Sequence, residues 1–166
     1  MGDTGRIGAV LSNLGVVALR SGDITRARRL CEESLKLARR QNNRFDMGLI
    51  MHNLAEVYYD EGDLPMAETM YRESLHLLTP FGERDFNSNS VLALGIIACR
   101  RGERGKNPLL RAGLTYRYSA ELPLNLFVEK QLECMSLRPS EYIDHITEHA
   151  AEQYLIETIE DLITAE

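Results

Sequence analysis

Residues 52–75 read HNLAEVYYDEGDLPMAETMYRESL, and this stretch decides the fold because altered copies of it lie on either side. Forty residues earlier, the matching positions hold Ser12-Asn13-Leu14-Gly15, Ser21-Gly22-Asp23, Ala27 and Glu33-Ser34-Leu35. A weaker copy forty residues later keeps Leu94-Gly95 and Arg101-Gly102-Glu103. Self-similarity at a fixed period of this length indicates a solenoid, in which each unit buries its apolar face against its neighbours.

The repeated positions resemble those of the tetratricopeptide repeat, a pair of antiparallel helices with small residues at set places. The matching slots are Leu14, Gly15, Ala18, Ala27 and Cys31, then Leu54, Ala55, Tyr58, Ala67 and Tyr71, then Leu94, Gly95 and Ala98. The resemblance covers about residues 5–120 and implies an all-α, right-handed solenoid of helical hairpins. Because the spacing exceeds the usual period of about 34 residues, the chain is similar to long-repeat members. These include kinesin light chains, bacterial peptide-sensing regulators and the C-terminal arrays of bacterial signalling ATPases and transcriptional activators.

Apolar periodicity and turn residues set the helix boundaries. They predict helices over about residues 4–20, 24–41, 44–60, 64–78 and 85–101, and a late sixth helix that starts at Pro108 behind the N-cap Asn107. These helices make three repeats within residues 1–120, at about 4–41, 44–79 and 85–120, and we expect the third to be irregular. Residues 121–166 are expected to cap the solenoid with a helical pair, whose last helix runs from Ser140 to about Ala165.

Two features point to self-association. The last predicted helix is longer than the repeats beneath it, so we expect a homodimer through residues 140–165. The charge is also banded: residues 1–45 carry nine basic and four acidic side chains, 46–99 carry two and nine, 100–120 carry six and one, and 121–166 carry two and eleven. Such bands fit either ordinary solvated faces or a basic end that packs against the acidic end of a second copy.

Composition fits one soluble globular domain, with 166 residues, 44% hydrophobic and 27% charged. No apolar run is long enough to cross a membrane, and the N-terminal residues lack the apolar core of a secretion signal. Cys31, Cys99 and Cys134 lie singly within apolar helical patterns, which predicts small core residues in a reducing compartment. These features predict a cytoplasmic protein.

One string suggests an enzyme, since His145-Ile146-Thr147-Glu148-His149 matches the H-x-x-E-H pattern of inverted zinc proteases. Two histidines four apart on a helix share a face and can hold a metal ion. The mechanism also needs a third ligand, and that family has it far downstream, whereas only 17 residues follow here. We therefore interpret His145 and His149 as residues on the solvated face of a capping helix, and we expect no metal site.

No other stretch suggests catalysis, because the chain has no glycine-rich phosphate loop and no G-x-S-x-G motif. We expect no cofactor and no small-molecule substrate. The arginine-rich face of residues 24–41 is the one candidate for nucleic acid. The net charge of -6 and the lack of interleaved aromatic residues argue against that partner.

The concave groove of such a solenoid is lined by the first helix of each pair, and we expect a peptide partner there. The predicted groove residues are Ser12, Asn13, Val16 and Arg20, then His52, Asn53, Glu56 and Tyr59, then Asn89, Ile96 and Arg100. Asn13 and Asn53 occupy one equivalent slot, and a side-chain amide offers a donor and an acceptor to the peptide groups of an extended ligand. The resemblance implies this role, and a helix cap or a bond between repeats is the alternative.

The sequence therefore predicts a non-catalytic module that binds a protein or peptide in a signalling or transcription-regulatory system of bacterial type. The alternative is a self-associating scaffold, dimeric through the C-terminal helix, with an empty groove.

Overall fold

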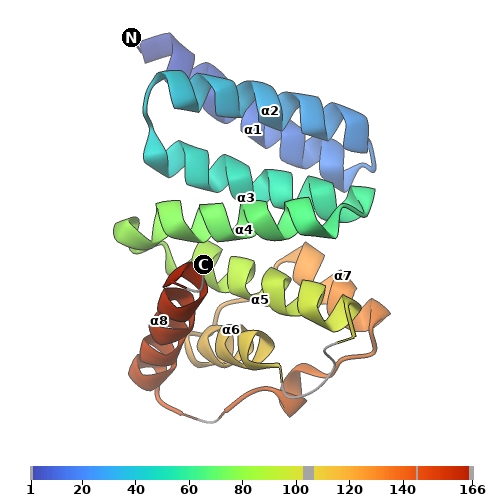
Figure 1. Cartoon of the computed structure of the whole chain (residues 1–166), viewed down its shortest axis with the longest axis vertical. Helices are drawn as coiled ribbons and strands as arrows, with labels where there is room; N and C mark the ends of the chain where they lie inside the picture. The colour runs from blue at the N-terminus through green and yellow to red at the C-terminus, as the bar shows by residue number, and fades with distance from the viewer. Residues whose placement is uncertain (1, 103–106, 145, 165–166) are drawn as a thin grey trace. The chain divides into compact units, whose positions relative to one another are not determined.

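The computed structural model describes residues 2–102, 107–144 and 146–164 (Figure 1). Every regular element within these ranges is a helix, which confirms the predicted all-α fold. None of the described helices is long and apolar enough to cross a membrane. The chain divides into two compact units, Met1–Gly82 and Glu83–Glu166.

The first unit consists of two helical pairs. Its helices are α1 (Gly2–Arg20), α2 (Ile24–Arg40), α3 (Arg44–Glu61) and α4 (Leu64–Leu78), followed by the short 3-10 helix η1 (Thr79–Phe81). α1 packs against α2, α2 against α3 and α3 against α4, and α1 also contacts α3 (Figure 1). The predicted boundaries of these four helices are confirmed to within two residues.

Each pair reverses direction through a Gly-Asp step. Gly22 and Gly62 have φ of 81° and 85°, in the left-handed region that favours glycine. The carboxylates that follow cap the next helix: Asp23 Oδ1 accepts a hydrogen bond from the Arg26 N–H at 3.1 Å, and Asp63 Oδ1 accepts one from the Met66 N–H at 3.1 Å. The repeated turn is therefore the same physical device used twice.

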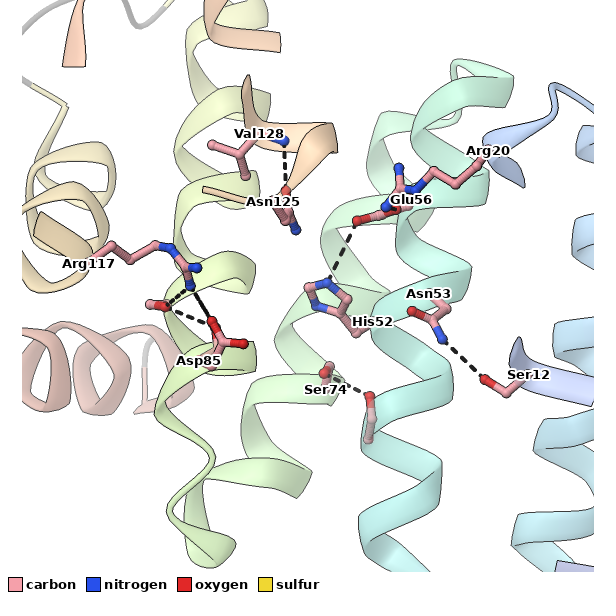
Figure 2. Close-up of polar contacts among 12 residues, drawn as sticks. Ser12, Arg20, His52, Asn53, Glu56, Ser74, Asp85, Arg117, Asn125 and Val128 are labelled. Carbon is pink, nitrogen blue, oxygen red and sulfur yellow. Dashed lines mark hydrogen bonds and ion pairs between the residues drawn. The ribbon is translucent and has the colours of Figure 1, made fainter. Parts of the chain in front are cut away.

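Within each pair the two helices approach closely. Ser34 Oγ donates to the Gly8 carbonyl at 2.7 Å. In the second pair, Ser74 Oγ donates to the Gly48 carbonyl at 2.8 Å (Figure 2). A Cβ added at Gly15 would lie 2.5 Å from Cys31 Sγ, so a larger residue there would push the helices apart. The Glu-Ser-Leu segments that repeat in the sequence thus bond the second helix of each pair to the first.

The second unit comprises α5 (Arg84–Arg100), α6 (Pro108–Ser119), α7 (Leu126–Cys134), η2 (Pro139–Glu141) and α8 (Glu148–Thr164). α6 packs on α5, α7 contacts α5, and α8 contacts α6 and α5. Asn107 caps the late-starting α6, as predicted, because its Oδ1 accepts hydrogen bonds from the Leu109 and Leu110 N–H groups. The core of the second unit includes Leu92, Leu110, Val128 and Leu155.

The predicted helix from Ser140 to about Ala165 is wrong at its start, because α8 begins at Glu148. The Asp144 N–H donates to Thr115 Oγ1 of α6 at 3.0 Å, and Arg111 of α6 pairs with the Asp144 carboxylate. These tertiary contacts hold the chain in a non-helical conformation next to α6. The helix that motivated a dimer through residues 140–165 is thus shorter than predicted, and its Ala151, Leu155 and Ile159 are buried.

Candidate functional site

The first unit contains a pocket of about 90 Å³ where α1 meets α2 and α3. It is lined by Gly5, Gly8, Ala9, Ser12 and Asn13 of α1, Ser34, Leu37, Ala38 and Gln41 of α2, and Asp46, Leu49 and Ile50 of α3. Its residues therefore come from both helical pairs of this unit, so the stacking of one pair on the next creates it.

Two glycines of α1 leave the space open. A Cβ at Gly5 would lie 3.5 Å from Gln41 Oε1, and a Cβ at Gly8 would lie 3.8 Å from Leu37 Cβ. These are ordinary contact distances for a Cβ, and any larger side chain at either position would extend into the pocket. The pocket thus depends on the absence of two side chains.

The lining combines an apolar part with a polar part. Leu37, Ala38, Leu49 and Ile50 supply aliphatic surface, and Ala38 and Ile50 are almost fully buried. Asn13 and Gln41 are exposed amides, and Asp46 is a half-buried carboxylate whose Oδ2 accepts from Asn43 Nδ2 at 2.7 Å. Concave ligand pockets combine these features, with apolar surface for affinity and a few polar groups for orientation.

The two predicted asparagines both lie at this junction, but their side chains make different contacts. Asn53 Nδ2 donates to Ser12 Oγ at 3.1 Å and so links α3 to α1 (Figure 2). Asn13 is exposed and lines the pocket. The bond between repeats, the alternative considered for this slot, is therefore present at Asn53, while the amide of Asn13 faces the space a ligand would occupy.

The remaining predicted groove residues of α3 belong to a buried polar cluster. Glu56 Oε2 accepts from Arg20 at 2.8 Å, and Glu56 Oε1 lies 3.8 Å from His52 Nε2 (Figure 2). The residues His52, Glu56 and Tyr59 are all less than 5% exposed. Burial raises the pKa of Glu56 to about 7, although the neighbouring Arg20 acts in the opposite direction.

Tyr71 of α4 completes this cluster, which lies beside the pocket rather than in it. The His52 ring packs edge-on against Tyr71 at 5.4 Å between centroids. The Tyr71 hydroxyl is buried without a hydrogen-bond partner among the described residues. Of the predicted groove residues, Ser12 is thus brought together with Asn53, and Arg20 and His52 with Glu56.

The other predicted positions are distributed as follows. Val16 is half-buried on α1. Asn89, Ile96 and Arg100 lie on α5 in the second unit, where the first two are buried and Arg100 is exposed. Their role in a groove stays a prediction. The sequence reasoning missed Gly5, Gln41 and Asp46, although glycines three apart on α1 were a visible signal of a recess in its surface.

The metal motif has no counterpart in the described structure. His145 lies outside the described residues, and His149 is exposed in the first turn of α8. Within the described residues, no group of three or more His, Cys, Asp or Glu side chains is placed to hold a metal ion.

Comparison with known proteins agrees with this architecture. A family model described as tetratricopeptide repeat matches residues 6–79, which cover most of α1, all of α2 to α4 and every pocket residue except Gly5. Searches of curated proteins and of solved structures gave no significant match. The matched segment contains both Gly-Asp turns and both Ser-to-carbonyl bonds described above. Residues 6–79 of this chain therefore belong to the tetratricopeptide repeat family.

Proposed function

We propose that this chain binds an extended segment of a protein partner in the groove between α1 and α3, with one aliphatic side chain of that segment in the pocket. Tetratricopeptide repeats generally mediate protein–protein interaction, and this coarser role applies to residues 6–79. The observation that carries the finer proposal is the pocket itself, with its aliphatic lining next to exposed amides.

The volume of the pocket limits which side chain of the partner can anchor the peptide there. A cavity of about 150 Å³ accommodates benzene, and the volume here is about 90 Å³. An aliphatic side chain of the size of valine or leucine suits this space better than an aromatic ring. The amides of Asn13 and Gln41 can pair with peptide groups on either side of the anchor without reading its sequence.

The setting follows from the kind of repeat. Among the long-repeat arrays that this chain resembles, the bacterial ones belong to signalling and transcription-regulatory proteins, and we propose such a system for this module. The free thiols of Cys31, Cys99 and Cys134 are compatible with the reducing cytoplasm.

The test uses peptides selected from a display library on the whole protein, followed by affinity measurement. We expect the selected peptides to share an aliphatic residue. Gly5→Leu should weaken their binding at least about ten-fold by filling the pocket, while Gly5→Ala should weaken it less. Both variants should melt no lower than the wild type, because leucine and alanine are better helix formers than glycine. Unchanged affinity in Gly5→Leu would exclude the pocket as the binding site.

Two further measurements, peptide affinity and sedimentation coefficient, distinguish peptide binding from the alternative of a self-associating scaffold. Asn13→Ala should weaken peptide binding without changing the sedimentation coefficient of the protein, because Asn13 is exposed and lines the pocket. A dimer that is unaffected by Asn13→Ala, in a protein that selects no peptide, would favour self-assembly. The burial of Ala151, Leu155 and Ile159 of α8 argues against the predicted dimer through residues 140–165.

A further inference from the structure

α1 carries an exposed apolar stripe that the groove does not use. Ile7 is 50% exposed, Val10 56%, Leu14 42% and Val17 64%. Their spacing of three, four and three residues places them on one face of the helix. None of them lines the pocket, whose α1 residues are Gly5, Gly8, Ala9, Ser12 and Asn13.

The internal repeat shows what such a stripe does. Forty residues later, the equivalent positions on α3 are Met47, Ile50, Leu54 and Val57. Ile50 and Leu54 are buried in a cluster with Cys31, Leu35 and Ala38 of α2, and Met47 packs against that cluster. Val57 is buried with Ala27 and Leu30 of α2. In α3 these four positions therefore form a seam, the apolar surface that packs against the preceding helix α2. In α1 the equivalent seam is exposed.

We propose that the stripe of Ile7, Val10, Leu14 and Val17 docks an acidic amphipathic helix of a partner protein, packed on α1 as α2 packs on α3. The repeat geometry supplies the packing mode, because α1 and α3 are equivalent helices with the same apolar positions. A helix with small and aliphatic residues on one face, like those of α2, fits this seam.

The charged side chains beside the stripe favour an acidic partner helix over a basic one. α3 carries Asp46 and Asp60, and the basic helix α2 covers it, with Arg28 paired to Glu61 at 3.1 Å. The α1 equivalent of Glu61 is Ser21, so α1 lacks the carboxylate that pairs with the basic helix, and it carries Arg6 and Arg20 where α3 has Asp46 and Asp60. Arg20 also pairs with Glu56 inside the unit. Further exposed basic side chains on α2 are Arg26, Arg29, Lys36 and Arg40.

A second copy of this chain is a poorer occupant. Two α1 helices placed seam to seam would bring the basic side chains beside one stripe close to those of the other, and like charges oppose association. The acidic helix α8 of a second copy already buries Ala151, Leu155 and Ile159 within its own unit.

The probe is a synthetic 17-residue helix with the length of α2. It keeps the apolar residues of α2 at their spacing, has alanine for cysteine, and carries glutamate in place of the arginines; a control peptide keeps the arginines. With a fluorescent label on each peptide and the whole protein, we expect the acidic peptide to bind at least about ten-fold more tightly than the basic one. Its binding should weaken as salt rises from about 50 to 500 mM, because salt screens exposed charges.

Variants locate the binding and separate it from the groove. Val10→Asp and Val17→Asp should each weaken the acidic peptide at least about ten-fold, and circular dichroism should confirm that helix content is retained. Thr25→Asp, which adds a charge on an exposed position of α2, and Gly5→Leu, which fills the pocket, should leave this binding unchanged. Failure of both peptides to bind, or loss of binding in Gly5→Leu, would overturn the proposal. So would a wild-type dimer that Val10→Asp dissociates, since a second copy would then cover the stripe.

Discussion

At the residue scale, Glu56 combines deep burial with an ion pair to Arg20. Its side chain is 4% exposed and pairs with Arg20, whose own side chain is 35% exposed. Burial raises the pKa of Glu56 to about 7, the negative charge of Asp60 adds to this rise, and Arg20 opposes it. The other titratable groups that face it are His52, Tyr71 and Cys31.

This shift predicts a pH dependence of stability. In the unfolded chain the carboxyl titrates near 4.5, and in the folded protein near 7. Between these values the folded state holds the proton more tightly, so stability falls as pH rises through the interval. The difference corresponds to a contribution on the order of 3 kcal/mol.

Urea unfolding at pH 5 and pH 8 measures this contribution. Wild type should lose more unfolding free energy than Glu56→Gln over this range, because glutamine keeps an acceptor for Arg20 but does not titrate. Glu73→Gln, at an exposed position of α4, should follow the wild type. Parallel profiles for wild type and Glu56→Gln would contradict the buried, protonated state.

The cysteines give a second prediction at this scale and a correction. The predicted core positions of Cys31 and Cys99 are confirmed, whereas Cys134 is exposed at the end of α7. Burial raises the pKa of Cys31 to about 11, which suppresses the reactive thiolate. We therefore expect one fast-reacting thiol per native chain with Ellman's reagent and three after denaturation. Loss of the fast phase in Cys134→Ser would assign it; a fast phase that persists would contradict the burial of the other two.

At the scale of the helices, Gly113 and Gly5 differ in how much space they leave for a Cβ atom. A Cβ at Gly113 of α6 would lie 2.6 Å from Leu92 Cγ and 3.2 Å from the Ser88 carbonyl oxygen of α5. At Gly5 of α1 the nearest atom, Gln41 Oε1, is 3.5 Å away. Alanine improves helix propensity equally at both positions, so any difference reports packing.

Gly113→Ala should therefore destabilise the protein by about 1–3 kcal/mol, the usual range for overpacking. Gly5→Ala should be neutral or stabilising by up to about 1 kcal/mol. Thermal unfolding of the two single variants measures both effects. Equal stability changes would show that α5 and α6 are not packed as closely as the structure has them.

Helix boundaries could be predicted from the sequence wherever local chemistry decided them. Gly62 with Asp63 ends one helix and caps the next, and Asn107 with Pro108 fixes the start of α6, because turn and cap residues act on their own backbone. The start of α8 could not be predicted in the same way. It depends on contacts of Asp144 with Thr115 and Arg111, residues about thirty positions away that no periodicity reveals.

The candidate site was also only partly predictable from the sequence. Asn13 and Ser12 were predicted because the repeat register places them on the groove side of α1. The burial of His52 and Glu56 was not predicted, since it depends on how α4 packs Tyr71 beside them. Repeat register identifies equivalent positions, and only packing between helices decides which of them a ligand can reach.

At the scale of the whole molecule, the chain divides at Gly82 and Glu83. The first unit holds its own core clusters, the pocket and the segment that matches the repeat family. We expect residues 1–82, expressed alone, to be helical, to unfold cooperatively and to bind the selected peptides within about three-fold of the whole protein. Circular dichroism and fluorescence anisotropy check this. A truncated chain without a cooperative transition would show that the unit is not autonomous.

The central claim is that a peptide binds between α1 and α3 through the pocket. The most direct measurement is a titration of the isotope-labelled whole protein with a selected peptide, followed by the backbone amide resonances. We predict that the signals of Gly5, Gly8, Asn13 and Leu49 shift in a saturable way, while those of α6 and α8 stay in place. Shifts confined to the second unit, or to Val10 and Val17 of the exposed stripe, would contradict the account.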